Sequence, residues 1–258
     1  MAGGNLQHQR FEYKYVINES IAAGIRSFVS GYLSLDPFGA RQANCSYPVH
    51  SLYLDSDDLK LYHSTINGER NRYKLRMRFY ENWPEAPVYF EIKRRNNAII
   101  TKERCAVTRD AAARVVDGLF PQEHEMVSQD PRNVNGLHQF MQLMTAINAR
   151  PKTHVSYFRE AWLQPGTNAV RVTMDRDVRS EPTFDVSLNT TFQNPVPVFG
   201  DAVILELKFT DRFPHWFREL VRVFGLQQGS AAKYVEGLYN MGPERLNRRR
   251  LMATGVPI

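Results

Sequence analysis

The sequence predicts an α+β protein in which about eight strands form a closed antiparallel β-barrel with flanking helices. Two observations lead to this class. Several segments alternate apolar and charged residues with the period of a β-strand, and helical segments lie between them without a regular strand–helix–strand repeat. The charged sides of so many strands need water or a polar interior, which a closed barrel supplies.

The first half of the chain is expected to hold five strands and three helical segments. Asn18 is a candidate N-cap for the first helix, because a side-chain oxygen can accept a free backbone N–H there. Residues 34–47, which include Pro37 and Gly39, are expected to form a loop. The expected strands are 10–17, 48–54, 71–80, 88–93 and 99–107, and the expected helical segments are 19–32, 59–64 and 110–119.

The second half is expected to hold three strands and three helices. Residues 121–133 and 180–200 are polar and irregular, and Pro165-Gly166-Thr167 is expected to form a turn between two strands. Pro214 occupies the favoured first turn of a helix. The expected strands are 152–162, 169–178 and 202–210, and the expected helices are 134–148, 214–224 and 231–240.

Composition suits a single globular domain over residues 1–258, with 43% hydrophobic and 23% charged residues. The net charge of +6 favours polyanionic partners, such as nucleic acid, phosphate chains, nucleotides or an anionic membrane. There are two cysteines and no zinc-ligand spacing, no signal-peptide core and no long apolar span. We therefore expect a cytoplasmic protein, with association to the inner face of a membrane only through a partner protein.

The segment from Asn71 to Glu81 carries the most informative alternation in the chain. In a strand, its four basic residues fall on one face and its apolar residues on the other. Such a row of like charges needs either an anionic partner or water between the groups. A solvent-facing edge strand is the alternative interpretation. The basic residues are Arg72, Lys74, Arg76 and Arg78, and the apolar ones are Tyr73, Leu75, Met77 and Phe79.

The same alternation recurs on five further strands. If their apolar faces pack on helices, their charged faces must line a common surface or interior, where Arg and Lys would bind a polyphosphate. Three glutamates on these faces, Glu12, Glu91 and Glu206, could hold a divalent cation, because hard cations prefer carboxylate oxygens. The charged-face sets are Arg10, Glu12 and Lys14; Glu91 and Lys93; Lys102 and Arg104; Arg171, Thr173 and Asp175; and Glu206 and Lys208.

Motifs in a fixed order resemble the VTC domain, the polyphosphate polymerase module within the triphosphate tunnel metalloenzymes. The resemblance covers roughly residues 8–241 and leaves 242–258 as a basic tail with Arg248, Arg249 and Arg250. It implies a tunnel of eight antiparallel strands that binds triphosphate or polyphosphate with Mn²⁺ or Mg²⁺. The motifs are Phe11-Glu12-Tyr13-Lys14-Tyr15, Ser51-Leu52-Tyr53-Leu54-Asp55, Lys74-Leu75-Arg76-Met77-Arg78, Phe90-Glu91-Ile92-Lys93, Leu205-Glu206-Leu207-Lys208 and Ala232-Lys233-Tyr234.

The resemblance also implies the roles of the residues. Glu206 would be the metal ligand, with Glu12 and Glu91 as further carboxylates, and Lys233 would approach the phosphate chain from the last helix. Phosphate contacts are also expected from Lys74, Arg10 and Arg104. The basic tunnel lining would comprise Lys14, Arg76, Arg78, Lys93, Lys102, Arg171 and Lys208.

The first strand departs from the pattern of hydrolytic and cyclase relatives, which typically carry Glu-x-Glu-x-Lys. Here Arg10 replaces the first glutamate of the run Arg10 to Lys14. Loss of a carboxylate weakens a two-metal site and removes a base for water. We therefore expect an ATP-dependent polyphosphate polymerase, with ATP and inorganic polyphosphate as partners and no nucleic acid. A metal-dependent triphosphatase and a non-catalytic polyphosphate-binding module remain the alternatives.

Overall fold

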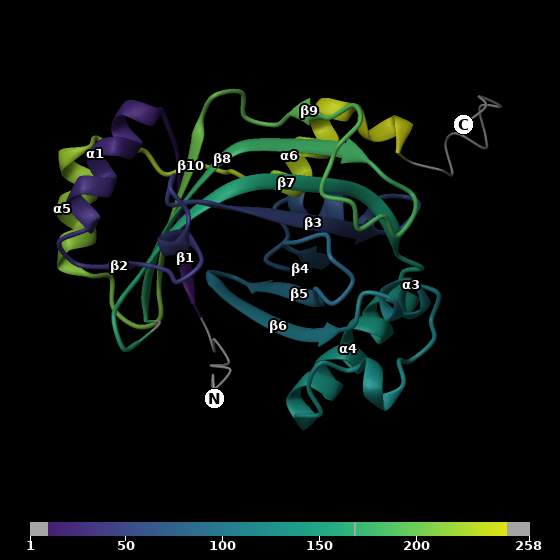
Figure 1. The fold of residues 1–258 in the computed structure, drawn as a ribbon. Coiled ribbons are helices and arrows are strands. Elements are labelled where there is room, and N and C mark those ends of the chain that lie inside the picture. Colours follow the sequence, from purple (N-terminus) through teal and green to yellow (C-terminus); the bar gives the residue numbers. More distant parts are fainter. Residues whose placement is uncertain (1–9, 168, 247–258) are drawn as a thin grey trace.

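A computed structural model describes residues 10–167 and 169–246, and an antiparallel sheet forms its centre (Figure 1). Eight long strands follow the order β1-β10-β8-β7-β3-β4-β5-β6, and two short strands pair beside them, β2 with β7 and β9 with β8. The bounds are β1 Phe11–Ile17, β2 Ser34–Leu35, β3 Tyr47–Asp55, β4 Asn71–Phe79, β5 Val88–Asn96, β6 Ile99–Val107, β7 Arg150–Leu163, β8 Val170–Pro182, β9 Val196–Pro197 and β10 Val203–Phe209.

The expected closed barrel needs a correction, because no continuous ladder joins the two edge strands within the described residues. β1 and β6 end the strand order, and they meet at one bridge. The backbone N–H of Arg10 donates to Ile100 O at 3.0 Å, and Ile100 N–H donates back to Arg10 O at 3.1 Å. Adjacent strands twist relative to one another, so edges that touch at one point separate beyond it. The fold is a curved antiparallel sheet with flanking helices.

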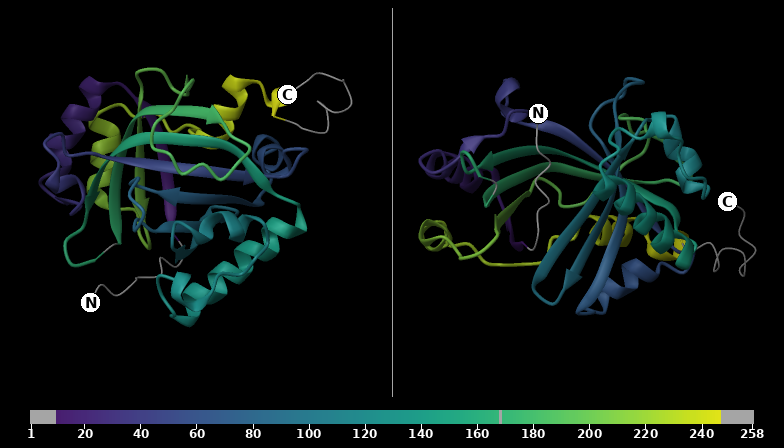
Figure 2. Two further views of the ribbon diagram at one scale, coloured as in Figure 1. Left: turned by 45° about the vertical axis from the view of Figure 1, so that its right-hand side comes forward. Right: turned by 90° about the horizontal axis from the view of Figure 1, so that it is seen from below.

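Two helices, α1 (Glu19–Val29) and α5 (His215–Val223), lie together at one end of the sheet (Figures 1 and 2). The Asn18 side chain accepts from the Ile21 N–H at 2.9 Å, which confirms the predicted cap of α1. Ile25 on α1 and Phe217 on α5 are fully buried against Leu205 of β10 and its apolar neighbours. This packing fixes the apolar face of β1, β8 and β10 outward and turns their charged face inward.

At the opposite end of the molecule, α3 (Ala111–Val116) and α4 (Pro131–Ala146) cover the outer face of the sheet (Figure 2). Phe140 of α4 meets Phe90 of β5 edge to face, with ring centroids 4.9 Å apart. Leu75 and Met77 of β4 belong to the same core and are fully buried. The predicted two-faced character of the basic strand is therefore confirmed.

The last long helix, α6 (Lys233–Met241), packs on the inward side of the sheet together with α2 (Lys60–Ile66). Tyr234 stacks on the inward-facing Tyr53 of β3 with ring centroids 4.8 Å apart. Its hydroxyl donates to the fully buried Asp55 at 2.6 Å, and Asp55 also accepts the backbone N–H groups of Leu61 and Tyr62 at the start of α2. These bonds hold α6 in place.

The structure also corrects some expected bounds. The region expected as a loop, 34–47, contains β2 and a short 3₁₀ helix, Gly39–Arg41, and β8 runs on to Pro182 into a stretch expected to be irregular. Two further 3₁₀ turns span Glu123–Glu125 and Pro243–Arg245. The three arginines predicted in the tail, 248–250, lie outside the described residues. No described helix combines the length and the apolar character needed to cross a membrane.

Candidate functional site

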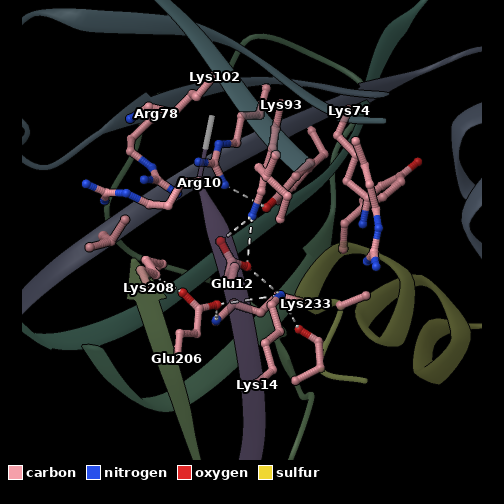
Figure 3. Close-up of a pocket in the computed structure, with 18 of the residues that line it drawn as sticks. Arg10, Glu12, Lys14, Lys74, Arg78, Lys93, Lys102, Glu206, Lys208 and Lys233 are labelled. Atoms are coloured by element: carbon pink, nitrogen blue, oxygen red, sulfur yellow. Dashed lines mark hydrogen bonds and ion pairs between the residues drawn. The ribbon is translucent and has the colours of Figure 1, made fainter. Parts of the chain in front are cut away.

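A cavity of about 560 Å³ lies against the inner face of the curved sheet (Figure 3). Arg72, Arg94, Arg95 and Arg159 add to the cations around it, whereas Glu12 and Glu206 are the carboxylates among its described lining residues. Strong positive charge therefore gathers in one cavity. Every basic residue predicted for the site lines this cavity: Arg10, Lys14, Lys74, Arg76, Arg78, Lys93, Lys102, Arg104, Arg171, Lys208 and Lys233.

The row of basic residues on β4 points into this cavity. Arg76 donates to Glu91 at 2.7 Å and to the Tyr53 hydroxyl at 3.2 Å, and Arg78 donates to the Tyr157 hydroxyl at 3.1 Å. Arg78 is only 6% exposed. The interpretation of β4 as a solvent-facing edge strand is therefore wrong for these two arginines.

Glu91 of β5 lies beneath the cations and outside the cavity lining. It is fully buried, and its oxygens lie 2.7 Å from Arg76, 3.3 Å from Arg104 and 3.4 Å from Lys102. Burial opposes its ionisation, but Lys102 and the arginines outweigh burial and hold the pKa of Glu91 well below its usual range. This position makes Glu91 a counter-charge that fixes the basic wall, rather than a carboxylate presented to a ligand.

Glu206 of β10 is the most heavily paired carboxylate at the cavity surface (Figure 3). Lys208 approaches it at 2.5 Å, Lys233 at 3.3 Å, and Lys14 and Arg159 at 3.6 Å each. Burial would raise the pKa of Glu206, but these cations hold it well below its usual range. Glu206 is therefore ionised and able to accept a cation.

The second carboxylate at the cavity, Glu12 of β1, shares Lys14 with Glu206. Lys14 lies 3.4 Å from Glu12, and Lys93 donates to both Glu12 oxygens at 3.0 Å (Figure 3). Burial works against the charge on Glu12, and Lys93 lowers its pKa far enough to keep it ionised. Two ionised carboxylates thus face one cavity among an excess of ammonium and guanidinium groups.

Arg159 of β7 was not predicted from the sequence, whereas its partner Asp175 of β8 was placed on a charged face but given no role at the site. Arg159 donates through two nitrogens to the two Asp175 oxygens at 2.7 Å each, and Lys233 adds a contact to Asp175 at 2.6 Å. Tyr157 and Arg159 share one face of their strand, and this spacing could have placed Arg159 at the site. The pattern is ambiguous because Glu160, on the opposite face, is also charged and pairs with arginines outside the cavity.

Two lysines of the cavity have pKa values close to neutrality. Burial and repulsion from Arg159 and Arg171 lower the pKa of Lys208 to about 7, against the pull of Glu206. Glu91 favours the charged form of Lys102, but burial and the neighbouring arginines lower its pKa to about 8. Burial and the excess of neighbouring cations together bring both pKa values toward physiological pH.

A divalent cation fits this donor set only together with substrate phosphates. No group of three or more His, Cys, Asp or Glu side chains that could hold a metal occurs among residues 10–167 and 169–246. Glu12 and Glu206 are nevertheless two ionised carboxylates at one cavity, and Mg²⁺ commonly binds through one or two carboxylates plus phosphate oxygens.

Comparison with known proteins identifies the family. The VTC domain matches residues 9–241, which is almost the whole chain. The chain belongs to the VTC domain family. No curated protein sequence matches it. Membership of the VTC domain family supports a polyphosphate-related or triphosphate-binding function, in an enzyme that handles triphosphates.

Solved structures also resemble this VTC domain. A candidate adenylate cyclase from Bacillus halodurans is 13% identical, with a TM-score of 0.50, over 86% of this chain and 92% of that one. A protein from Pyrococcus horikoshii is 12% identical, with a TM-score of 0.45, over 90% of this chain and 99% of that one. At this identity the first likeness shows a shared fold.

Proposed function

We propose that this VTC domain is an ATP-dependent polyphosphate polymerase, which transfers the γ-phosphoryl group of ATP to the end of a growing polyphosphate chain. The observation that carries the proposal is the convergence of cations from seven strands and α6 on one cavity. Only two carboxylates among the described residues face that cavity. An arrangement of this kind suits a substrate that is itself a chain of negative charges.

The chemistry requires charge neutralisation and alignment more than acid–base catalysis. A terminal oxygen of the polyphosphate chain attacks the γ-phosphorus, the bond from that phosphorus to the bridging oxygen breaks, and ADP leaves with the bonding electrons. The attacking oxygen is already anionic and needs no strong base. Its repulsion from the donor must be cancelled, and Arg76, Arg78 and Arg159 supply fixed positive charge on one wall of the cavity.

Glu206 and Glu12 would hold the divalent metal in this proposal. A bound Mn²⁺ or Mg²⁺ supplies Lewis-acid stabilisation of phosphate oxygens. Both carboxylates are paired with lysines at the cavity, Glu206 with Lys208 and Glu12 with Lys93. An incoming triphosphate offers those lysines other anionic partners, which would free the carboxylate oxygens for the cation.

A metal-dependent triphosphatase with the same cavity is the second candidate function, and Arg10 counts against it. Arg10 stands where hydrolytic relatives typically carry a carboxylate, is 7% exposed, and lines the cavity. Burial and the nearby Arg171 lower its pKa to about 10, so it stays cationic near neutral pH. A cation at this position provides no base for an attacking water but can bind another phosphate.

The decisive experiment incubates the purified protein with ATP and Mn²⁺ and resolves the products on a gel stained for polyphosphate, beside a phosphate-release assay. Accumulation of long chains supports the polymerase. Release of orthophosphate without chains supports the triphosphatase. Strongly salt-dependent polyphosphate binding without turnover would reduce the protein to a binding module.

A further inference from the structure

An exposed aromatic side chain, Phe38, stands beside the cavity, where the function proposed above gives it no role. It is 63% exposed, and its ring is parallel to that of Tyr80 within 6°, with centroids 6.5 Å apart. The centroid of the Tyr47 ring lies 5.7 Å from that of Phe38 and 6.3 Å from that of Tyr80. Tyr47 and Tyr80 line the cavity, and the Tyr47 ring is tilted by 50° to Phe38 and by 54° to Tyr80, so the three rings form an aromatic cluster between solvent and the cations.

The segment that presents Phe38 is held rigidly. Asp36 is 3% exposed, accepts the Gly39 N–H at 2.7 Å and accepts the Tyr47 hydroxyl at 2.8 Å. A Cβ atom at Gly39 would lie 2.8 Å from the backbone oxygen of Cys45, so a glycine is needed there. A ring on a backbone held in this way loses less conformational entropy when a ligand binds, which favours stacking.

Phosphate-binding arginines lie directly beside this cluster. The carboxylate of Asp36 is 3.6 Å from Arg171, and Arg104 donates to the Tyr80 hydroxyl at 3.4 Å. Arg104 also lies over the Tyr89 ring, 3.5 Å from its centroid. A ligand with a flat ring on Phe38 would therefore place an attached phosphate chain among the guanidinium groups.

The two ends of β4 differ in the residues that lie beside them. Tyr80 follows the last residue of the strand, whereas Arg72, near its beginning, faces Arg95 of β5 in the sheet register. A strand rises about 3.3 Å per residue, so these two ends of β4 are well separated. A base at the Tyr80 end would have Arg78 and Arg104 beside it, with the further cations of β4 and β5 along the path of an attached phosphate chain.

We propose that Phe38, with Tyr47 and Tyr80, is a stacking platform for the nucleobase of the phosphoryl donor, and that the donor enters the cavity from this end. The inference rests on the proposed function for the identity of the donor as a nucleoside triphosphate. Stacking is tolerant of base identity because every base has a π-face. The platform therefore predicts a preference for larger purine rings without strict selection between adenine and guanine.

Binding measurements test the platform separately from turnover. The probes are the β,γ-imido analogue of ATP, which carries a base, and inorganic tripolyphosphate, which does not. Phe38→Ala is expected to weaken binding of the analogue about tenfold, as for the loss of one base–aromatic stack, and to leave the affinity for tripolyphosphate unchanged. Tyr239→Ala is the matched control, because Tyr239 is 66% exposed and does not line the cavity.

A second variant supplies an optical readout. Phe38→Trp is expected to keep the affinity for the analogue, with indole fluorescence that changes on adding the analogue and not on adding tripolyphosphate. If Phe38→Ala lost affinity equally for both probes, or for neither, the stacking proposal would be wrong, and the proposed polymerase function would be unaffected. Failure of both probes to bind the wild-type protein would instead remove the proposed function, and the platform with it.

Discussion

Lys233 Nζ lies 2.6 Å from Asp175 Oδ2, so the first residue of α6 is tied by a buried ion pair to the middle of β8. Asp175 is fully buried and also receives both hydrogen bonds of Arg159. One carboxylate therefore holds two cavity cations from different elements in place. Burial opposes the charge on Lys233, but Asp175 and Glu206 outweigh it and raise its pKa, which keeps Lys233 charged.

Replacing this carboxylate tests whether the cavity cations need a counter-charge. Asp175→Asn leaves Arg159 and Lys233 buried with less compensation, and we expect a loss of about 3 kcal/mol in the free energy of unfolding. Tripolyphosphate supplies negative charge to the same groups, so it should raise the melting temperature more in the variant than in the wild type. Thermal unfolding with and without tripolyphosphate measures both effects.

Asp177→Asn is the matched control for that experiment. Asp177 lies on the same strand, half exposed, and pairs with the exposed Arg179 at 2.8 Å. Exposed pairs contribute little, so this variant should match the wild type within about 0.5 kcal/mol. Equal behaviour of the two variants would show that Asp175 is not the counter-charge of the cavity.

Variants of Glu206 and Glu91 distinguish metal binding from support of the basic cavity wall. Glu206→Gln should abolish metal-dependent turnover with a normal circular dichroism spectrum, because it removes a charged metal ligand and keeps the shape of the side chain. Glu91→Gln should lower the melting temperature without removing a metal ligand, because Glu91 neutralises Arg76, Arg104 and Lys102 from beneath. Titration of activity with Mn²⁺ distinguishes them, and near-normal activity of Glu206→Gln would remove Glu206 from the site.

The double variant Arg76→Ala with Arg78→Ala tests phosphate recognition by β4. Loss of two charge-assisted contacts should weaken tripolyphosphate binding by several kcal/mol, at about 1.5–3 kcal/mol for each contact. Isothermal titration calorimetry measures the change. Arg132→Ala is the control, because Arg132 is an exposed arginine paired with Asp130 at the start of α4. Unchanged affinity in the double variant would mean that β4 does not bind the ligand.

Tripolyphosphate binding should take up protons near pH 8. In the free protein the pKa of Lys208 is about 7, so above that pH the lysine is mainly neutral. A bound polyanion favours the charged form and raises this pKa, so binding draws in a proton and affinity falls as the pH rises from 7 to 9. Calorimetry in buffers of different ionisation enthalpy measures the uptake. Lys208→Met should reduce it, and uptake equal to that of the wild type would assign the proton elsewhere.

Alternation along the strands was enough to predict much of this site. A period of two decides which side chains of a strand share a face, and the helices α1, α4 and α5 supply apolar partners for the other face. Ten of the eleven basic residues predicted for the site come from segments predicted as strands, and all ten line one cavity, whereas Lys233 reaches it from α6. The face on which a side chain lies does not, however, tell how deeply that side chain is buried below the cavity surface. Glu91 shares a face with Lys93, but it lies beneath the arginines instead of at the cavity surface.

The sequence by itself determined which residues turn inward, because alternation follows from the geometry of a single strand. Tertiary structure decided what those residues meet. The Arg159–Asp175 pair, the position of Lys233 against β8 and the meeting of the sheet edges at Arg10 and Ile100 all join segments far apart in the chain. Such contacts depend on strand order, register and twist, which no local pattern specifies.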